Sequence, residues 1–209
     1  MVCAHGLSIG CDFAGLETPI WALKVLNVDF KHVVSCDTSV ASRKISRHLG
    51  VEHCDSDIND RRMPGHVDVY VFGPPCQPFS KCGKGLGVDD PENGLLVLKS
   101  MMYVIERKPG LILMEQVPTV KTGKHREIWD AVIAVLTELG YHLTVQTLQS
   151  NHFGVPQNRE RVYLMGALQA GGFEVPYPPS YGPEHDRQAL APERVPLVPD
   201  CAETSASHH

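Results

Sequence analysis

The sequence of 209 residues predicts an α/β protein built on a doubly wound, mostly parallel sheet. Three observations carry this prediction. Short apolar runs rich in β-branched residues alternate along the chain with segments of helical spacing, and Gly, Pro or Asp bounds each apolar run, as is typical of buried strands. The alternation keeps the rhythm of βαβ units, whose crossover helices make successive strands parallel.

Four units of strand and helix follow one another before the pattern changes. In chain order, each predicted strand is given with the helix after it: 7–13 with 19–27, 32–37 with 38–49, 67–72 with 94–107, and 111–115 with 124–139. The last helix places Ile128, Val132, Leu136 and Leu139 on one face. Gly140 is a natural stop for it, because glycine favours the end of a helix.

A closing pair of strands, 141–149 and 160–167, is predicted with no helix between them. Beyond this pair the composition changes: residues 169–209 contain seven prolines and show little hydrophobic periodicity. We therefore expect one domain over residues 1–168 and a tail over residues 169–209 that is extended or partly disordered.

The bulk composition is that of an ordinary globular protein, with 43% hydrophobic and 21% charged residues. It excludes disordered, collagenous and disulfide-scaffold classes for most of the chain. The formal net charge of -5 is concentrated in residues 169–209, where six acidic side chains stand against two arginines. The near-neutral remainder neither indicates nor excludes a nucleic-acid partner, so charge alone does not identify what the protein binds.

The cysteines and the N-terminal residues indicate the cellular compartment of the protein. The seven cysteines include no C-x-x-C pair, and residues 1–15 lack the basic region and long apolar core of a secretory leader. No stretch approaches the roughly 18 continuous apolar residues of a membrane span. We therefore expect reduced thiols in a nuclear or cytoplasmic protein that is neither secreted nor inserted in a membrane.

The spacing of ligand-type residues does not favour metal binding. Five residues separate Cys76 from Cys82, and His53 and Cys54 are adjacent, so neither pair follows a standard zinc pattern. The other histidines are scattered along the chain. The sequence therefore predicts no metal site.

A cysteine in a proline-flanked loop is the first candidate for chemistry. Cys76 lies in the run GPPCQPFS, residues 73–80, directly after the predicted strand 67–72. The carboxyl ends of parallel strands form the edge where open α/β sheets bind ligands. Most cysteines are small buried hydrophobes, but the prolines hold this loop rigid and keep the thiol out of a packed helix. Cys76 is therefore a candidate nucleophile.

Two further runs carry charged side chains at strand ends. In MEQVP an apolar strand ends on Glu115. Such a carboxylate is usually the first solvated residue, but one that points into a pocket can act as an acid or hydrogen-bond donor. In QNRER, residues 157–161, alternation puts Gln157, Arg159 and Arg161 on one face of a strand. Two guanidinium groups on one face suit phosphate or carboxylate recognition, the alternative being an exposed edge strand with surface ion pairs.

Taken together, GPPCQPFS, MEQVP and NHFGVPQNRERVY resemble, in this order and separation, motifs IV, VI and VIII of the C5 cytosine methyltransferases. That family methylates cytosine in DNA or, in one branch, in tRNA. The resemblance covers residues 9–166 and includes Phe13-Ala14-Gly15, similar to the cofactor loop of motif I, and Asp57-Ile58, similar to the adenine-contacting pair of motif III. It implies the Rossmann-like sheet of class I methyltransferases, S-adenosyl-L-methionine as cofactor, and nucleic acid as substrate, with DNA favoured over RNA.

The resemblance also implies a mechanism that these residue types can perform. Cys76 as a thiolate would add to C6 of cytosine, while Glu115 would hold and protonate the N3 edge. Arg161, with Arg159 beside it, would orient the pyrimidine oxygen and position Glu115. C5 then takes the methyl group, a base removes the C5 proton, and Cys76 is expelled. Because C6 cannot be reached inside a duplex, a double-stranded substrate must have its target base flipped out.

Binding residues follow from the same motifs. The cofactor-binding residues that the resemblance implies are Phe13, Ala14, Gly15, Asp37, Asp57, Ile58, Pro74 and Leu95, the last falling where motif V supplies an apolar contact. The implied substrate-binding residues are Gln77, Ser80 and Gln157.

Three features depart from the family pattern. Glu17 and Thr18 stand where motif I usually has paired glycines, which adds bulk and removes conformational freedom at positive φ. The ribose-binding glutamate would fall on Ser35, so either Asp37 takes its place or cofactor binding is weaker. After motif VIII the family continues into a target-recognition domain and motifs IX and X, whereas residues 169–209 show none of these elements.

These departures leave several functions open. The first is an active enzyme, split or truncated, that needs a second polypeptide for target recognition. One alternative is a catalytically silent module that binds cofactor or a protein partner. Another is a methyltransferase acting on RNA or on a free pyrimidine nucleotide, for which a duplex-reading domain is unnecessary.

Overall fold

The computed structural model describes residues 6–61, 65–75, 96–122 and 126–168. Cys76, Gln77, Ser80 and Leu95 lie outside the described residues, as does the predicted tail from residue 169 onward. Within the described ranges, no helix is long and apolar enough to cross a membrane.

A seven-stranded sheet organises the described part of the chain, in the order β3-β2-β1-β4-β5-β7-β6. The strands are β1 Leu7–Asp12, β2 Phe30–Cys36, β3 His53–Asp55, β4 Val69–Phe72, β5 Leu111–Gln116, β6 Tyr141–Gln149 and β7 Glu160–Leu168. Neighbouring strands from β3 across to β5 are parallel, and β7 lies antiparallel between β5 and β6. This confirms the predicted sheet and its closing pair. The sequence does not reveal β3, because three residues are too few to show a period.

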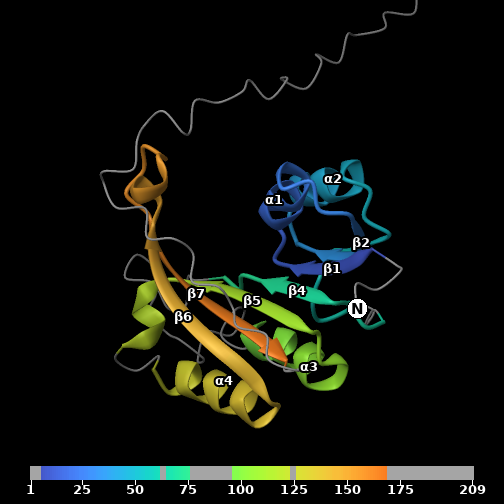
Figure 1. Cartoon of the computed structure of the whole chain (residues 1–209). Helices are drawn as coiled ribbons and strands as arrows, with labels where there is room; N and C mark the ends of the chain where they lie inside the picture. Colours follow the sequence, from blue (N-terminus) through green and yellow to red (C-terminus); the bar gives the residue numbers. More distant parts are fainter. Residues whose placement is uncertain (1–5, 62–64, 76–95, 123–125, 169–209) are drawn as a thin grey trace, which may run out of the picture.

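Helices cover both faces of this sheet, as Figure 1 shows. On one face lie α1 (Thr18–Val25) and α2 (Val40–His48), and on the other lie α3 (Leu96–Arg107) and α4 (Arg126–Glu138). The Ser39 side chain begins α2 by accepting a hydrogen bond from the Ser42 backbone N–H at 3.3 Å. The predicted apolar face of α4 buries Val132 and Leu136, and Gly140 follows its end with φ of 92°. Two short 3-10 helices, η2 (Pro118–Lys121) and η4 (Ser150–Phe153), follow β5 and β6.

The hydrophobic core has one part on each face of the sheet. The larger part packs Tyr70 and Phe72 of β4 against the inner faces of α3 and α4. The smaller part contains Ile9 and Cys11 of β1 and Ile20 of α1. Successive side chains of a strand point to opposite faces, so β4, the middle strand of the sheet, contributes to both parts: Val69 and Val71 pack against the smaller one.

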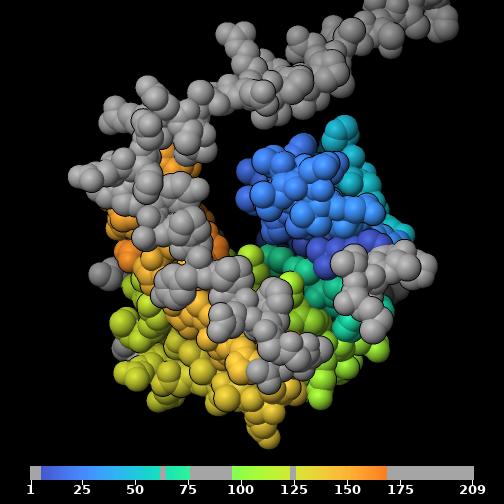
Figure 2. Space-filling view, in the orientation of Figure 1, coloured from blue at the N-terminus to red at the C-terminus, as the bar shows by residue number. Residues whose placement is uncertain are grey.

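The chain changes direction between β1 and β4. From β1 it moves outward to β2 and β3, and from β4 it moves the other way to β5. Open α/β sheets bind ligands at such a switch point, beyond the carboxyl ends of the strands. Phe13 to Gly15 follow β1, and Pro74 follows β4, so both segments lie at this edge. Figure 2 shows a hollow between the blue surface of the N-terminal part and the orange end of β6 and β7.

Candidate active site

Glu115 and two arginines meet near the carboxyl end of β5. The Nε of Arg161 lies 2.9 Å from Glu115 Oε1, and the Nη2 of Arg159 lies 3.4 Å from the same oxygen. The Arg161 side chain is 18% exposed and that of Arg159 is 48% exposed, so solvent screens the Arg161 contact less. The structure thus brings together three of the four residues for which the sequence predicts catalytic roles. The fourth, Cys76, lies outside the described residues.

Tyr163, the last residue of the run NHFGVPQNRERVY, is a neighbour of Glu115 for which the sequence predicts no role. It pairs with Glu115 across β5 and β7, and it lines a concavity of about 210 Å³ together with Phe153, Arg159 and Arg161. Burial, and then the negative charge of Glu115, raises the pKa of Tyr163, so its hydroxyl stays protonated at neutral pH. The concavity combines guanidinium donors with aromatic rings, which suits a planar base that carries a carbonyl oxygen.

Gln157 lies in the exposed turn between η4 and β7. The Ser150 hydroxyl donates a hydrogen bond to the Gln157 carbonyl and accepts one from the Arg159 backbone N–H at 3.1 Å. The Gln157 backbone N–H donates to the Val155 carbonyl at 2.7 Å. Ser150 therefore holds the turn that leads into Arg159, while the Gln157 side chain stays exposed.

Gln116 anchors the start of the loop that leads to Cys76. Its side chain is 1% exposed, and its Nε2 donates a hydrogen bond to the Pro74 carbonyl at 2.8 Å. A Cβ added at Gly73 would lie 3.6 Å from Glu115 Oε2, so this loop begins beside the carboxylate. Gln116 follows Ile112 and Met114 on the buried face of β5, and this interrupted apolar alternation is the signal that could have identified it.

The segment after β1, which the sequence predicts as the cofactor loop, is held against the end of β2. The Gly15 backbone N–H donates to Asp37 Oδ2 at 2.8 Å, and the Ala14 N–H donates to the Cys36 carbonyl at 3.2 Å. Asp37 Oδ1 also accepts a hydrogen bond from the Ser39 N–H at 2.8 Å. Asp37 therefore lies at the edge where the sequence predicts the cofactor, and it fixes the loop backbone.

Two of the three departures from the family pattern lie beneath this loop. Ser35 is fully buried, and its Oγ lies 2.9 Å from the Oγ of Ser46 on α2, so it faces the core and not the ligand edge. Glu17 is also fully buried and accepts a hydrogen bond from Ser46 Oγ at 2.6 Å. Its backbone φ is 56°, a left-handed conformation that glycine adopts without the steric cost that glutamate has. Asp37 is consequently the acidic side chain that the end of β2 presents near the loop.

Asp57 and Ile58 follow β3, on the same edge of the sheet as Asp37. Asp57 Oδ1 accepts hydrogen bonds from the backbone N–H of Asn59 at 2.8 Å and from its side-chain nitrogen at 3.0 Å. The Ile58 side chain is 8% exposed, so it offers an apolar surface close to the core. The predicted cofactor residues thus follow β1, β2, β3 and β4 at one edge.

A buried ion pair that no motif indicated connects these segments. Asp12, the last residue of β1, accepts hydrogen bonds from Arg61, Tyr70 and Ser100. The side chains of Asp12 and Arg61 are 0% and 1% exposed. Burial raises the pKa of Asp12, while the charge of Arg61 and the hydrogen bond from Tyr70 oppose that rise. Because Arg61 lies three residues after Ile58, the network ties the segment after β3 to the end of β1.

Sequence comparisons show which known proteins this chain resembles. The family model described as C-5 cytosine-specific DNA methylase matches residues 21–205. The Type II methyltransferase M.AquIA of Picosynechococcus is 33% identical over 204 residues, which cover 90% of this chain and 77% of that protein. M.HaeII of Haemophilus aegyptius is 37% identical over 123 residues, covering 59% of this chain and 38% of that protein. M1.ScrFI of Lactococcus lactis is 37% identical over 109 residues, and the chain spans 28% of its length.

Solved structures share the fold. The S. pombe Dnmt2 methyltransferase superposes with a TM-score of 0.62 at 23% identity, covering 80% of this chain and 53% of that one. An E. coli prophage protein described as a DNA modification methyltransferase gives a TM-score of 0.60 at 17% identity, covering 78% and 47%. These likenesses confirm the predicted Rossmann-like fold of the class I methyltransferases.

Proposed function

The chain belongs to the C-5 cytosine-specific DNA methylase family, and from this membership we propose that it transfers a methyl group from S-adenosyl-L-methionine to C5 of cytosine in nucleic acid, with DNA favoured over RNA. One observation carries the proposal for this chain. The Glu115 carboxylate contacts Arg161 and Arg159 next to Gly73, where the loop that contains Cys76 begins. The proposed acid, the two arginines that position it and the start of the loop that contains the proposed nucleophile therefore lie close together.

The proposed reaction begins when the Cys76 thiolate adds to C6 and forms a carbon–sulfur bond. Glu115 gives a proton to N3, which offsets the negative charge that the addition places on the ring. C5 then bonds to the methyl carbon as the bond between that carbon and the cofactor's sulfur breaks, and the sulfur keeps the electron pair. A base removes the C5 proton, the C5–C6 double bond forms again, the bond to Cys76 breaks, and the N3 proton returns to Glu115. Arg161 keeps the carboxylate aligned through both proton transfers.

The residues at the switch point fit S-adenosyl-L-methionine, which supplies the methyl group as an electrophile when it is bound. A carboxylate has about four lone-pair sites, and the Asp37 carboxylate uses two of them for the backbone N–H groups of Gly15 and Ser39. The others would accept hydrogen bonds from ribose hydroxyls. Asp57 and Ile58 would contact the adenine through its amino edge and its face, with Pro74 and Leu95 adding apolar surface.

We assign target recognition to a second polypeptide, and exposed apolar side chains at the loop and α1 support this assignment. Leu16, Trp21, Val25 and Leu26 are 68%, 44%, 79% and 70% exposed. Large exposed apolar groups gathered in one region are typical of a protein interface. Co-purification of a second chain from the native source is the expected result. Full sequence-specific activity of this chain alone would contradict the assignment.

Transfer of a labelled methyl group tests the proposed activity. Protein purified from its source, so that any partner is retained, is incubated with unmethylated DNA, with tRNA and with cytidine nucleotides. We expect labelled DNA with the wild type and none with Cys76→Ala. Cys54→Ala, which removes a partly exposed thiol from β3, is the matched control and should remain active.

Each other outcome identifies a different function. Equal incorporation of labelled methyl groups by Cys76→Ala and the wild type would contradict the proposed mechanism. Labelling of tRNA or of free nucleotides without labelling of DNA would assign one of the alternative substrates. Failure to bind S-adenosylhomocysteine in calorimetry, with DNA present, would identify the chain as a catalytically silent module.

A further inference from the structure

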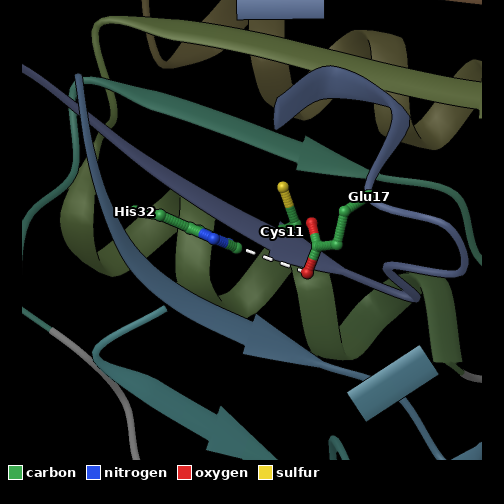
Figure 3. A group of neighbouring side chains, drawn as sticks. All are labelled: Cys11, Glu17 and His32. Carbon is green, nitrogen blue, oxygen red and sulfur yellow. Dashed lines mark ion pairs between the residues drawn. The ribbon is translucent and has the colours of Figure 1, made fainter. Parts of the chain in front are cut away.

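Three ligand-type side chains converge beneath the segment after β1. Cys11 comes from β1, Glu17 from the segment just before α1, and His32 from β2. The sulfur, a carboxylate oxygen and a ring nitrogen all lie within 4.8 Å of one another. The three residues are 2%, 0% and 4% exposed, in that order. Figure 3 shows the His32 ring and the Glu17 carboxylate pointing toward each other beside the Cys11 thiol.

Polar atoms of this cluster are buried without hydrogen-bond partners. Both ring nitrogens of His32 and Oε2 of Glu17 have no hydrogen-bond partner. The nearest approach of the two side chains, 3.7 Å from His32 Nε2 to Glu17 Oε1, is too long for a hydrogen bond. Buried polar groups are normally paired because desolvation without a new partner costs free energy. Because no protein group satisfies these atoms, they indicate that a ligand binds here.

We propose that Cys11, Glu17 and His32 bind a divalent transition-metal ion, with zinc as the best fit. Sulfur, imidazole and carboxylate are the ligand types that zinc takes in proteins, whereas magnesium and calcium prefer oxygen alone. Binding converts the Cys11 thiol to a thiolate and releases its proton to solvent, with no change of oxidation state. Two negative ligands and a neutral imidazole then balance the charge of the ion, so the buried site is neutral overall.

The geometry is close to that of a tetrahedral site. Zinc bonds of about 2.0–2.3 Å place neighbouring ligand atoms roughly 3.3–3.8 Å apart. The 3.7 Å separation of His32 and Glu17 already lies in that range, and the largest separation, 4.8 Å at most, needs an inward movement of about 1 Å. Three protein ligands leave one position, which water fills in sites of this kind.

Neighbouring serines already orient one ligand. Ser46 Oγ donates to Glu17 Oε1 at 2.6 Å, and Ser35 Oγ lies 2.9 Å from Ser46 Oγ. Such outer contacts fix the orientation of a ligating carboxylate, and Oε2 of Glu17 keeps both of its lone pairs unused. The ion would join β1 and β2 to Glu17, two residues after Gly15, so its occupancy would hold the loop that is proposed to bind the cofactor.

Elemental analysis of the full chain, purified without a metal-affinity step, loaded with zinc and dialysed, tests the site. We expect one zinc ion per chain in the wild type and a loss of most of it in Cys11→Ala and Glu17→Gln. Cys36→Ala is the matched control, because Cys36 is an equally buried thiol at the end of β2 outside the cluster, and it should keep the metal. Cobalt in place of zinc should give a sulfur-to-metal charge-transfer band that Cys11→Ala abolishes and Cys36→Ala retains.

The wild type alone also decides the question if the variants fail to fold. X-ray absorption at the zinc edge should show one sulfur among nitrogen and oxygen neighbours. Dialysed wild-type protein without bound zinc, or a coordination shell without sulfur, would overturn the proposal. Equal zinc in Cys11→Ala would overturn it as well, by assigning the metal to other histidines. None of these readouts depends on methyl transfer.

Discussion

The two oxygens of Glu115 face different parts of the site: Arg161 Nε lies 2.9 Å from Oε1, while Oε2 lies on the side of Gly73. Oε1 is thereby held by guanidinium groups, and Oε2 faces the loop that leads to Cys76. In the proposed mechanism, this arrangement would separate positioning from proton transfer within one carboxylate. Arg161, the less exposed arginine, would then be the main positioning residue, and Arg159 makes a longer and more solvated contact.

Arg161→Ala should lower kcat for methyl transfer by roughly 10²-fold, because the acid loses its alignment in the transition state. Arg159→Ala should have a clearly smaller effect on kcat, because its contact is longer and 48% of its side chain is exposed. Steady-state kinetics with varied DNA and cofactor separates kcat from KM. An equal or larger loss of kcat in Arg159→Ala would reverse this assignment of roles.

Gln116→Leu should reduce the free energy of unfolding by about 1–3 kcal/mol, because it leaves the buried Pro74 carbonyl without its donor. Gln146→Leu is the matched control, since Gln146 is 6% exposed and neither polar atom of its side chain has a partner. That control should be neutral or stabilising. Urea unfolding followed by circular dichroism measures both variants, and similar losses in the two would show that the bond to Pro74 contributes little.

Arg61→Met should destabilise the fold by about 3–5 kcal/mol, because Asp12 would remain buried without its countercharge. Arg126→Met removes an arginine from an ion pair with Asp130 whose side chains are 69% and 58% exposed. That exposed pair should change stability by less than about 1 kcal/mol. Thermal and urea unfolding compare the two. Comparable effects would mean that the Asp12 network adds no more than a surface pair.

Stability should decline in alkaline solution as Cys36 titrates. Burial raises the pKa of Cys36 from 9.0 to about 12. The folded protein therefore keeps the thiol proton that the unfolded chain loses, so this contribution is complete below pH 9.0 and is lost as pH rises toward about 12. Between pH 9.0 and 10.0, below the ordinary pKa of Tyr103, Cys36→Ala should show a shallower decline in unfolding free energy than the wild type. Parallel curves would contradict the buried-thiol explanation.

Local patterns in the sequence account for most of the fold. The apolar runs at β1, β2, β4 and β5 and the apolar face of α4 are visible because each spans enough residues to show a period. β3 has three residues and shows none. The pattern also indicates the residues at strand ends that carry charge, which is why Glu115, Arg159 and Arg161 could be selected before their contacts were known.

Side chains whose roles depend on contacts with distant parts of the chain could not be identified from the sequence pattern. Gln116 and Tyr163 lie within MEQVP and NHFGVPQNRERVY, but nothing in those runs indicates what they contact, and Arg61 lies outside every motif. Each derives its role from a partner far away in the chain. Glu17 and Ser35 could be read from sequence only as departures from a pattern. The fold shows instead that both face the core beneath α2 and that Glu17 meets Cys11 and His32 there.

Periodicity and short motifs were enough to predict the class of fold, the order of its longer elements and the family, because both are properties of neighbouring residues. The folded chain was needed to show which oxygen of Glu115 the arginines hold, which residue anchors Pro74 and which three side chains gather at the proposed metal centre. These depend on distances between strands that the sheet brings together, and a linear spacing contains no information about such distances.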